Sequence, residues 1–282
     1  MNQKVGPYHV VELPASRRET PNMLDIYWWK HSIYALLEVD VTTARQFISE
    51  HKERTGEGLS FTGWLAYCLA RAVDEDKSVQ AYLKGRKKLV MFDNVDVGLP
   101  VEREIGGKRT PIGYVIRNAN HKTFLEIHKE IRAVQTEPAP PGRGMPRWLQ
   151  FGLLFPAPLS TLFVGLLRAA IRWDPTITVA QAGTVGVTSV GMFGKGRSSG
   201  WGLTPPMHSL FLIVGGISRK PAVVDDRIEP REILNLTIGF NHDVVDGGPA
   251  ARFVHRLLEL IEGGYGLMEV KQAMRADVSV PA

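Results

Sequence analysis

The sequence predicts an α+β fold in which a mixed β-sheet packs against helices. Strand-like and helix-like segments follow one another without strict alternation, which favours a layered α+β sheet over a doubly wound parallel one. The 282 residues, 44% of them hydrophobic and 22% charged, are typical of a globular protein that buries a full core. This length fits one large domain or two small ones, and the sequence shows no internal repeat.

The expected strands are apolar, β-branched runs bounded by glycine-rich or charged turns. They cover residues 33–41, 89–92, 95–101, 113–117, 184–189, 210–215 and 233–240, and a further strand is expected to begin at Thr176. The expected helices have apolar side chains three and four positions apart. They cover residues 42–54, 60–73, 122–134 and 249–261.

Three segments are expected along the chain. Residues 1–29 are mostly polar, and we expect them to form an irregular N-terminal arm. Residues 30–264 are expected to form one domain, interrupted by an apolar insert at about 137–175 that begins with a proline- and glycine-rich break. Residues 265–282 are expected to form a C-terminal tail.

Charge and cysteine content narrow the class of protein. The net charge of +5 and the pI of about 9.3 predict mild attraction for anions, such as a phosphorylated cofactor. No nucleic-acid motif or dense basic helix is visible, so nucleic acid is not an expected partner. The single cysteine, Cys68, lies within an apolar helix and is expected to be a buried, inert thiol. Residues 1–14 lack an apolar signal core, so we expect a cytoplasmic location.

The insert contains a charge-free stretch, residues 148–167, with arginines on both sides. Its length permits a membrane span. Pro156 and Pro158 would break a lone helix in lipid, and a span here would separate the two halves of the domain, so a span is not favoured. A helix pair lying at a membrane interface, a lid, a subunit contact and an apolar substrate channel stay open.

The most informative stretch, residues 241–247, reads Asn-His-Asp-Val-Val-Asp-Gly and lies between the last strand and the last helix. His242 is therefore held at a strand end, a position that suits proton transfer by a side chain that titrates near neutrality. A structural histidine and a helix cap at Asp246 are the simpler interpretations. A metal site formed by His242, Asp243 and Asp246 is weaker, because no second cluster offers further ligands, and we expect no metal.

A second motif ends the strand expected at 184–189. Thr188 and Ser189 place two hydroxyls there, and a glycine-rich basic loop follows. The loop does not fit the pattern of a phosphate-binding P-loop. Together with His242, a hydroxyl at this point indicates a hydrogen-bond donor for an oxyanion.

Both motifs together resemble the catalytic domain of the dihydrolipoamide acyltransferases, which form the core of 2-oxo acid dehydrogenase complexes. The family's Asp-His-Arg-x-x-Asp-Gly is similar to residues 241–247, and its Thr-Ile-Ser-Asn-Leu-Gly-Met-Phe-Gly is similar to residues 186–194. The resemblance extends over most of residues 30–135 and 180–264. It implies a chloramphenicol acetyltransferase-like two-layer sandwich, with a mixed central sheet flanked by helices.

The resemblance also implies a function. A coenzyme A-dependent acyltransferase would move an acyl group between a coenzyme A thioester and a thiol or hydroxyl acceptor. His242 would be the general base and Thr188, at the position of the family's serine, the oxyanion donor. Asp246 would hold the turn around the histidine, and Ser189 and Arg117 are candidates for binding coenzyme A. No metal and no covalently attached lipoyl group are expected.

The resemblance further implies a homotrimer whose active site joins two subunits, with a larger cubic or icosahedral assembly as a further expectation. The acceptor would be a small molecule or a group on a carrier. Asn241 and Asp243 replace the family's Asp and Arg, so an Arg–Asp pair that braces the loop is missing. Two alternatives therefore stay open. One is a non-catalytic scaffold in a 2-oxo acid dehydrogenase complex; the other is a membrane-associated acyltransferase for a lipid-like acceptor, with peripheral contact through residues 148–167.

Overall fold

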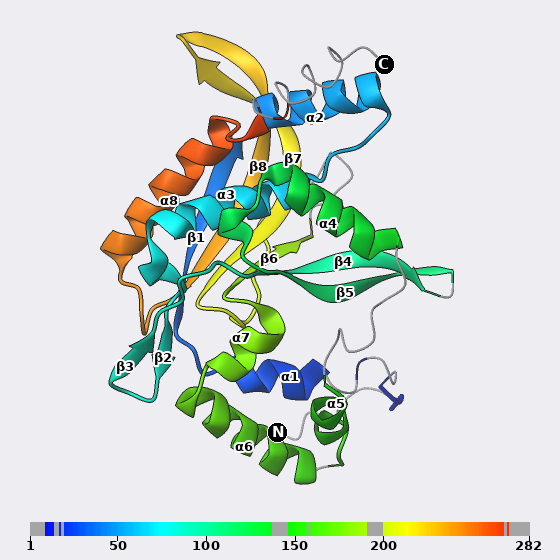
Figure 1. Ribbon diagram of the computed structural model, residues 1–282, viewed down its shortest axis with the longest axis vertical. Coiled ribbons are helices and arrows are strands. Elements are labelled where there is room, and N and C mark those ends of the chain that lie inside the picture. Colours follow the sequence, from blue (N-terminus) through cyan, green and yellow to red (C-terminus); the bar gives the residue numbers. More distant parts are fainter. Residues whose placement is uncertain are drawn as a thin grey trace, which may run out of the picture.

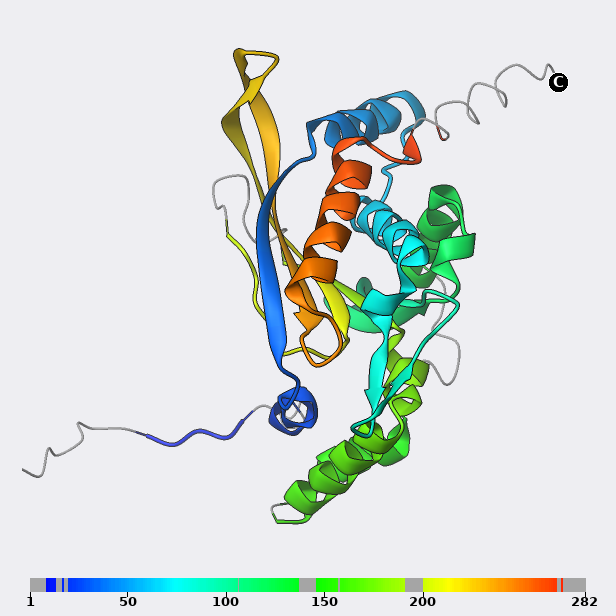
Figure 2. The ribbon, with the colours of Figure 1, turned by 90° about the vertical axis from the view of Figure 1, so that its left-hand side faces the viewer.

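The computed structural model describes residues 9–13, 17, 20–105, 107–136, 146–156, 158–190, 200–267 and 270. Within these residues, a six-stranded mixed sheet forms one layer and a group of helices covers one of its faces (Figures 1 and 2). In sheet order the strands are β1 (Ser32–Asp40), β8 (Arg227–Asn241), β7 (Leu210–Val224), β6 (Val185–Ser189), β4 (Val97–Ile105) and β5 (Lys108–Ile116). The covering helices are α2 (Thr42–Thr55), α3 (Phe61–Glu75), α4 (Phe124–Thr136) and α8 (Gly247–Glu262).

The sheet is mixed because β6 runs parallel to both of its neighbours, β4 and β7, while the other pairs are antiparallel. A separate hairpin joins β2 (Tyr82–Lys84) to β3 (Lys88–Val90). Short 3₁₀ turns occupy Lys77–Gln80 and Ala119–His121. The predicted α+β two-layer fold is confirmed.

The main core lies between the sheet and the helix layer, and α3 is its centre. Ser60 caps this helix, since its hydroxyl accepts a hydrogen bond from the backbone N–H of Gly63 at 3.1 Å. Trp64, Leu65 and Leu69 are fully buried along it, a burial worth about 1.5–3 kcal/mol for each large apolar side chain. Cys68 lies in the same row, and its burial raises the pKa of the thiol, as expected for an inert cysteine.

Strands β7 and β8 are longer than the sequence predicts. Each has 15 residues, and their outer halves form a hairpin that projects beyond the rest of the sheet (Figure 2). In those halves the side chains are mostly partly or fully exposed, whereas the inner halves are continuously buried. The charged residues of the outer halves therefore face solvent, and a register shift between Val214 and Ile217 separates the inner pairing of β7 and β8 from the outer pairing.

Two predictions about local structure were wrong. Residues expected to belong to an irregular arm form helix α1 (Thr20–Tyr27), whose Met23, Ile26 and Tyr27 pack on the insert. The strand expected from Thr176 is instead helix α7 (Thr176–Ala182), preceded by Pro175 at its N-cap position. Its Thr, Ile and Val residues favour strands only weakly, and packing against α6 and β5 overrides that preference.

The insert forms two helices, α5 (Arg147–Leu153) and α6 (Leu159–Trp173), at the opposite end of the molecule from α2 (Figure 1). With α1 they build a second, smaller core from Ile26, Leu153, Val164, Leu167 and Ile171. Among the described residues, no helix is both long enough and apolar enough to cross a membrane.

Candidate active site

His242 directly follows the last residue of β8, as the sequence predicts. Its backbone N–H donates to the carbonyl of His31 at 2.7 Å, which ties the loop to the residue before β1. The N–H groups of Val244 and Val245 both donate to the carbonyl of Asn241 at 3.0 Å. Asn241 itself is buried, so the loop is fixed at the point where the histidine leaves the sheet.

The His242 ring is oriented by its own loop. Nδ1 lies 3.0 Å from the carbonyl oxygen of Val245, which can only accept a hydrogen bond. In the neutral ring the proton is therefore on Nδ1 and the lone pair is on Nε2. The side chain is 45% exposed, so Nε2 is accessible to a substrate. A neutral ring held in this tautomer can act as a general base through Nε2.

Asp246 has a smaller part in this geometry. It occupies the N-cap position of α8 with extended backbone, but its side chain makes no capping hydrogen bond. Its Oδ1 is 3.8 Å from Nδ1 of His242, and the carboxylate is 88% exposed. At that distance and exposure, solvent screens most of the attraction between the two groups.

The two residues that depart from the family signature make contacts of their own. Asn241 accepts a hydrogen bond through Oδ1 from the backbone N–H of Asp243 at 3.1 Å. Asp243 in turn lies 2.8 Å from Nδ1 of His31, a residue 212 positions away. The loop is therefore braced against the start of β1 without an Arg–Asp pair. Sequence reasoning did not find His31, because no spacing or motif connects it to the loop.

A buried lysine lies beside this loop. Lys30 is 7% exposed, and its Nζ donates to the carbonyl of Met207 at 2.5 Å. The ammonium also lies 5.4 Å and 5.2 Å from the ring centroids of Tyr27 and Tyr82. Burial lowers the pKa of Lys30 from 10.5 to about 7, and the negative charge of Asp243 offsets part of this effect.

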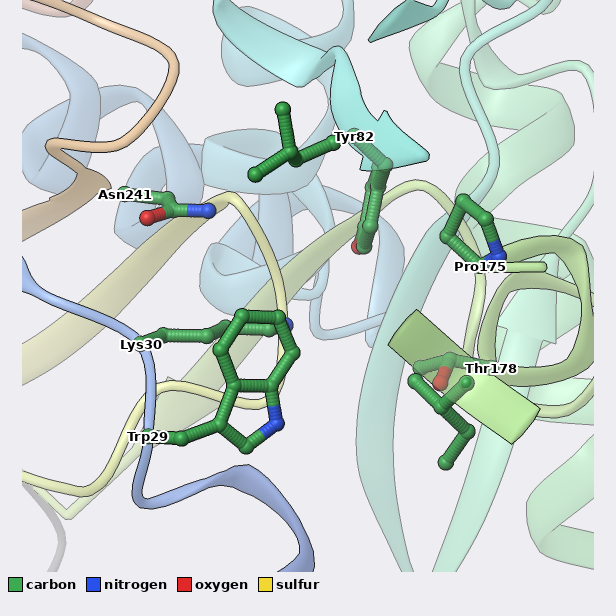
Figure 3. Close-up of a pocket in the computed structure, with 8 residues that line it drawn as sticks. Trp29, Lys30, Tyr82, Pro175, Thr178 and Asn241 are labelled. Atoms are coloured by element: carbon green, nitrogen blue, oxygen red, sulfur yellow. The ribbon is translucent and has the colours of Figure 1, made fainter. Parts of the chain in front are cut away.

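Lys30 and Asn241 line a small pocket where the insert meets the end of β8 (Figure 3). The figure shows the Lys30 side chain and the Trp29 ring on one side of this space and Pro175 and Thr178 on the other. The full lining is Trp29, Lys30, Tyr82, Leu83, Ile171, Pro175, Thr178 and Asn241.

We expect the Lys30→Met variant to differ from the wild type in how its stability depends on pH. Between about pH 7 and 10.5 the unfolded chain binds more protons at Lys30 than the folded one, so the wild type gains stability as pH rises. The free energy of unfolding rises by at most about 1.4 kcal/mol per pH unit. The variant lacks this contribution, because methionine does not titrate. Urea unfolding of both proteins across this range measures the difference, and equal slopes would contradict a buried Lys30.

Thr188 and Ser189 end strand β6, and both are partly buried. Thr188 pairs with Ile213 on β7, and Ile213 pairs with Thr237 on β8. His242 lies five residues beyond Thr237, and β8 is two strands away from β6. The Cα atoms of Thr188 and His242 are therefore roughly 15–20 Å apart. A single chain does not bring the Thr188 hydroxyl and the His242 ring together.

Thr188 faces away from the helix layer. Its neighbours Val185 and Val187 belong to the main core, and alternation along the strand turns Thr188 to the other face. That face also carries exposed apolar side chains: Tyr34, Leu36, Val190, Trp201 and Leu203. The remainder of the second motif, residues 191–194, lies outside the described residues.

The two candidates for binding coenzyme A lie at opposite ends of β6. Ser189 is its last residue, whereas Arg117 contacts the segment that leads into it. The guanidinium of Arg117 donates to Asp96 at 2.7 Å and to the carbonyl of Ala180 at 2.7 Å. These bonds hold the end of α7 against the sheet. Within one chain, Ser189 and Arg117 therefore do not form a common phosphate site.

Comparison with known proteins supplies a family match. The model of the 2-oxoacid dehydrogenases acyltransferase (catalytic domain) family matches residues 9–139 and 176–269. The match includes α1 and leaves out residues 140–175. A lipoamide acyltransferase component of the branched-chain alpha-keto acid dehydrogenase complex from Bacillus subtilis is 26% identical over 234 residues, or 81% of this chain and 46% of that protein. The chain spans less than half the length of the curated relatives it matches.

Two solved structures share the fold. A probable dihydrolipoamide acetyltransferase from Listeria monocytogenes has a TM-score of 0.63 at 18% identity, covering 92% of this chain and 96% of that one. The dihydrolipoamide acetyltransferase of Azotobacter vinelandii has a TM-score of 0.61 at 19% identity, covering 92% and 97%.

Proposed function

Since the chain belongs to the family of 2-oxoacid dehydrogenase acyltransferase catalytic domains, we propose that it transfers an acyl group between a coenzyme A thioester and a thiol or hydroxyl acceptor. One observation carries the proposal: Nδ1 of His242 bonds the Val245 carbonyl, which leaves an accessible Nε2 as the base. A thiol needs such a base, because only a few per cent of it is ionised at neutral pH.

In the proposed reaction, coenzyme A supplies the acyl group as a thioester. Nε2 of His242 takes the proton from the acceptor as its sulfur or oxygen attacks the thioester carbonyl. The Thr188 hydroxyl donates a hydrogen bond to the oxyanion that forms. As the carbon–sulfur bond to coenzyme A breaks, the protonated His242 returns its proton to the leaving thiolate, so the base is regenerated. The Val245 carbonyl keeps the ring oriented through both steps.

The site is proposed to join two subunits of a trimer. His242 and Thr188 are far apart in one chain, and Thr188 lies on the sheet face that no described helix covers. Exposed apolar side chains such as Leu36 and Trp201 on that face suit a subunit contact. A neighbour docked there could bring its His242 loop to Thr188. One solved neighbour is described as the cubic core of a pyruvate dehydrogenase complex, and a larger cubic or icosahedral assembly remains a proposal here.

Two further roles are proposed, one for Asp246 and one for Ser189 and Arg117. Asp246 is proposed to maintain the turn at the start of α8 rather than to transfer protons, given its exposure. Ser189 and Arg117 remain candidates for binding coenzyme A, each at a different end of β6. The proposed acceptor is a small molecule or a group on a carrier.

A transfer assay tests the proposed function. The purified chain is incubated with a panel of acyl-coenzyme A donors and with dihydrolipoamide, small hydroxyl compounds or lipid-like alcohols as acceptors, and release of the coenzyme A thiol is measured. Acceptor-dependent release supports the proposal, and light scattering is expected to give the mass of a trimer. A stable trimer that transfers no acyl group to any acceptor would favour the scaffold alternative instead.

A further inference from the structure

The helices of the insert carry an apolar outer face that no other described element covers. On the inner side of α6, Val164, Leu167 and Ile171 pack into the small core. On its outer side the leucines are more than half exposed, although burial is the usual state for such side chains. The exposed apolar residues of the pair are Trp148 (57%), Phe151 (65%), Leu154 (45%), Phe155 (48%), Leu159 (56%), Leu162 (62%), Leu166 (63%) and Trp173 (77%).

No charged side chain interrupts this face. Residues 148–167 contain none, and the guanidinium of Arg168 turns inward to donate to the carbonyl of Asp25 on α1. Trp148 stands at the beginning of the pair and Trp173 at its end, and both indole rings are largely exposed. Tryptophan is enriched where an apolar phase meets water.

A cluster of positive charge adjoins the same end of the molecule. The turn of the β2–β3 hairpin reads Lys84-Gly85-Arg86-Lys87-Lys88, and its four basic side chains are exposed. The backbone N–H of Gly85 donates to the carbonyl of Arg172 at 2.8 Å, which fixes the turn against the end of α6 (Figures 1 and 2). Arg172 adds a fifth cation, and Asp174 is the one acidic residue that directly follows α6.

We propose that the outer face of α5–α6 and the basic turn 84–88 together bind an anionic lipid membrane. The apolar face enters the boundary between headgroups and acyl chains, while the basic turn contacts anionic headgroups. The basic turn favours an anionic lipid surface over a second copy of the chain as the occupant, because a second copy has a net charge of +5 and would be repelled. The surface excludes His242 and Thr188, so the proposal does not depend on acyl transfer.

Vesicle co-sedimentation of the full chain tests the proposal. We expect binding to vesicles of phosphatidylcholine mixed with phosphatidylglycerol, weaker binding to phosphatidylcholine alone, and loss of the difference at high salt, because exposed charges are screened. Absence of binding to the anionic vesicles would overturn the proposal.

Two sets of variants assign the binding to this surface. The double variant Leu162→Asp and Leu166→Asp removes the apolar contact. Its control, Val223→Asp and Ile228→Asp, changes two apolar residues of the β7–β8 hairpin that are somewhat more exposed. A triple variant reverses the charge of the turn: Arg86→Glu, Lys87→Glu and Lys88→Glu. Its control reverses three exposed basic residues elsewhere on the surface: Lys52→Glu, Arg109→Glu and Lys129→Glu. Each surface variant is expected to bind about tenfold more weakly or worse, and each control about as well as the wild type.

Circular dichroism confirms that every variant is folded, and light scattering gives its mass. If the leucine variant lowers the mass of the assembly while vesicle binding stays at the wild-type level, the face is a subunit contact and the membrane proposal is wrong. The proposal is equally wrong if the control variants lose binding as much as the surface variants do.

Discussion

Replacing His242 by alanine is expected to lower the rate of acyl transfer about 10²–10⁴-fold, the usual contribution of a positioned general base. The variant leaves the acceptor thiol without a group to take its proton, whereas the fold is expected to remain, since the ring is 45% exposed and lies outside the core. Steady-state kinetics with an acyl-coenzyme A donor measures the effect, and the loss is expected in kcat more than in KM.

A second histidine provides the matched control for this variant. His255 lies on α8 with 79% of its side chain exposed, close to Glu259 and away from the strand end. His255→Ala is expected to keep the wild-type rate. If His242→Ala also kept it, another group would have to be the base, and the function built on the His242 geometry would fail.

Replacing Thr188 by valine is expected to lower kcat about 10²–10³-fold, because the oxyanion loses a preorganised donor. Valine keeps the branched shape that fits the partly buried end of β6, so the change removes the hydroxyl with little change in packing. Thr188→Ser retains the donor and is expected to retain most of the activity. A valine variant with the rate of the wild type would exclude Thr188 as the oxyanion donor.

A mixing experiment separates a site between subunits from a site within one chain. The inactive His242→Ala and Thr188→Val chains are co-expressed so that they form mixed trimers. If each site takes its histidine from one subunit and its hydroxyl from the next, random mixing restores about a quarter of the sites. If both residues act within the same chain, no activity returns, and the roughly 15–20 Å separation deduced from the strand register would have to be reconsidered.

The accuracy of the sequence-based prediction differs between the elements of the main core and the short helices that pack near the insert. Strands such as β1 and helices such as α3 were predicted to within two residues, because their apolar residues repeat with the period of the element and all face one core. Helix α7 was mistaken for a strand, since seven residues are too few to show a helical period and Thr, Ile and Val dominate them. Helix α1 was missed because its stability comes from contact with α6.

The sequence by itself determined where His242 lies. The pattern changes there from a continuous apolar strand to helical spacing, and a change of period marks a junction without any knowledge of packing. It likewise placed Thr188 at a strand end. Both conclusions concern residues that are close together in the chain.

Only the tertiary structure decided what surrounds these residues. The contact of Asp243 with His31, the burial of Lys30 and the turn of Thr188 toward the uncovered face of the sheet depend on segments brought together by folding. The insert shows the same division, since its sequence reveals a charge-free stretch but not which side chains face inward. Packing selects those partners from many chemically equivalent ones, because such contacts join residues as far apart as 212 positions and leave no periodic trace in the sequence.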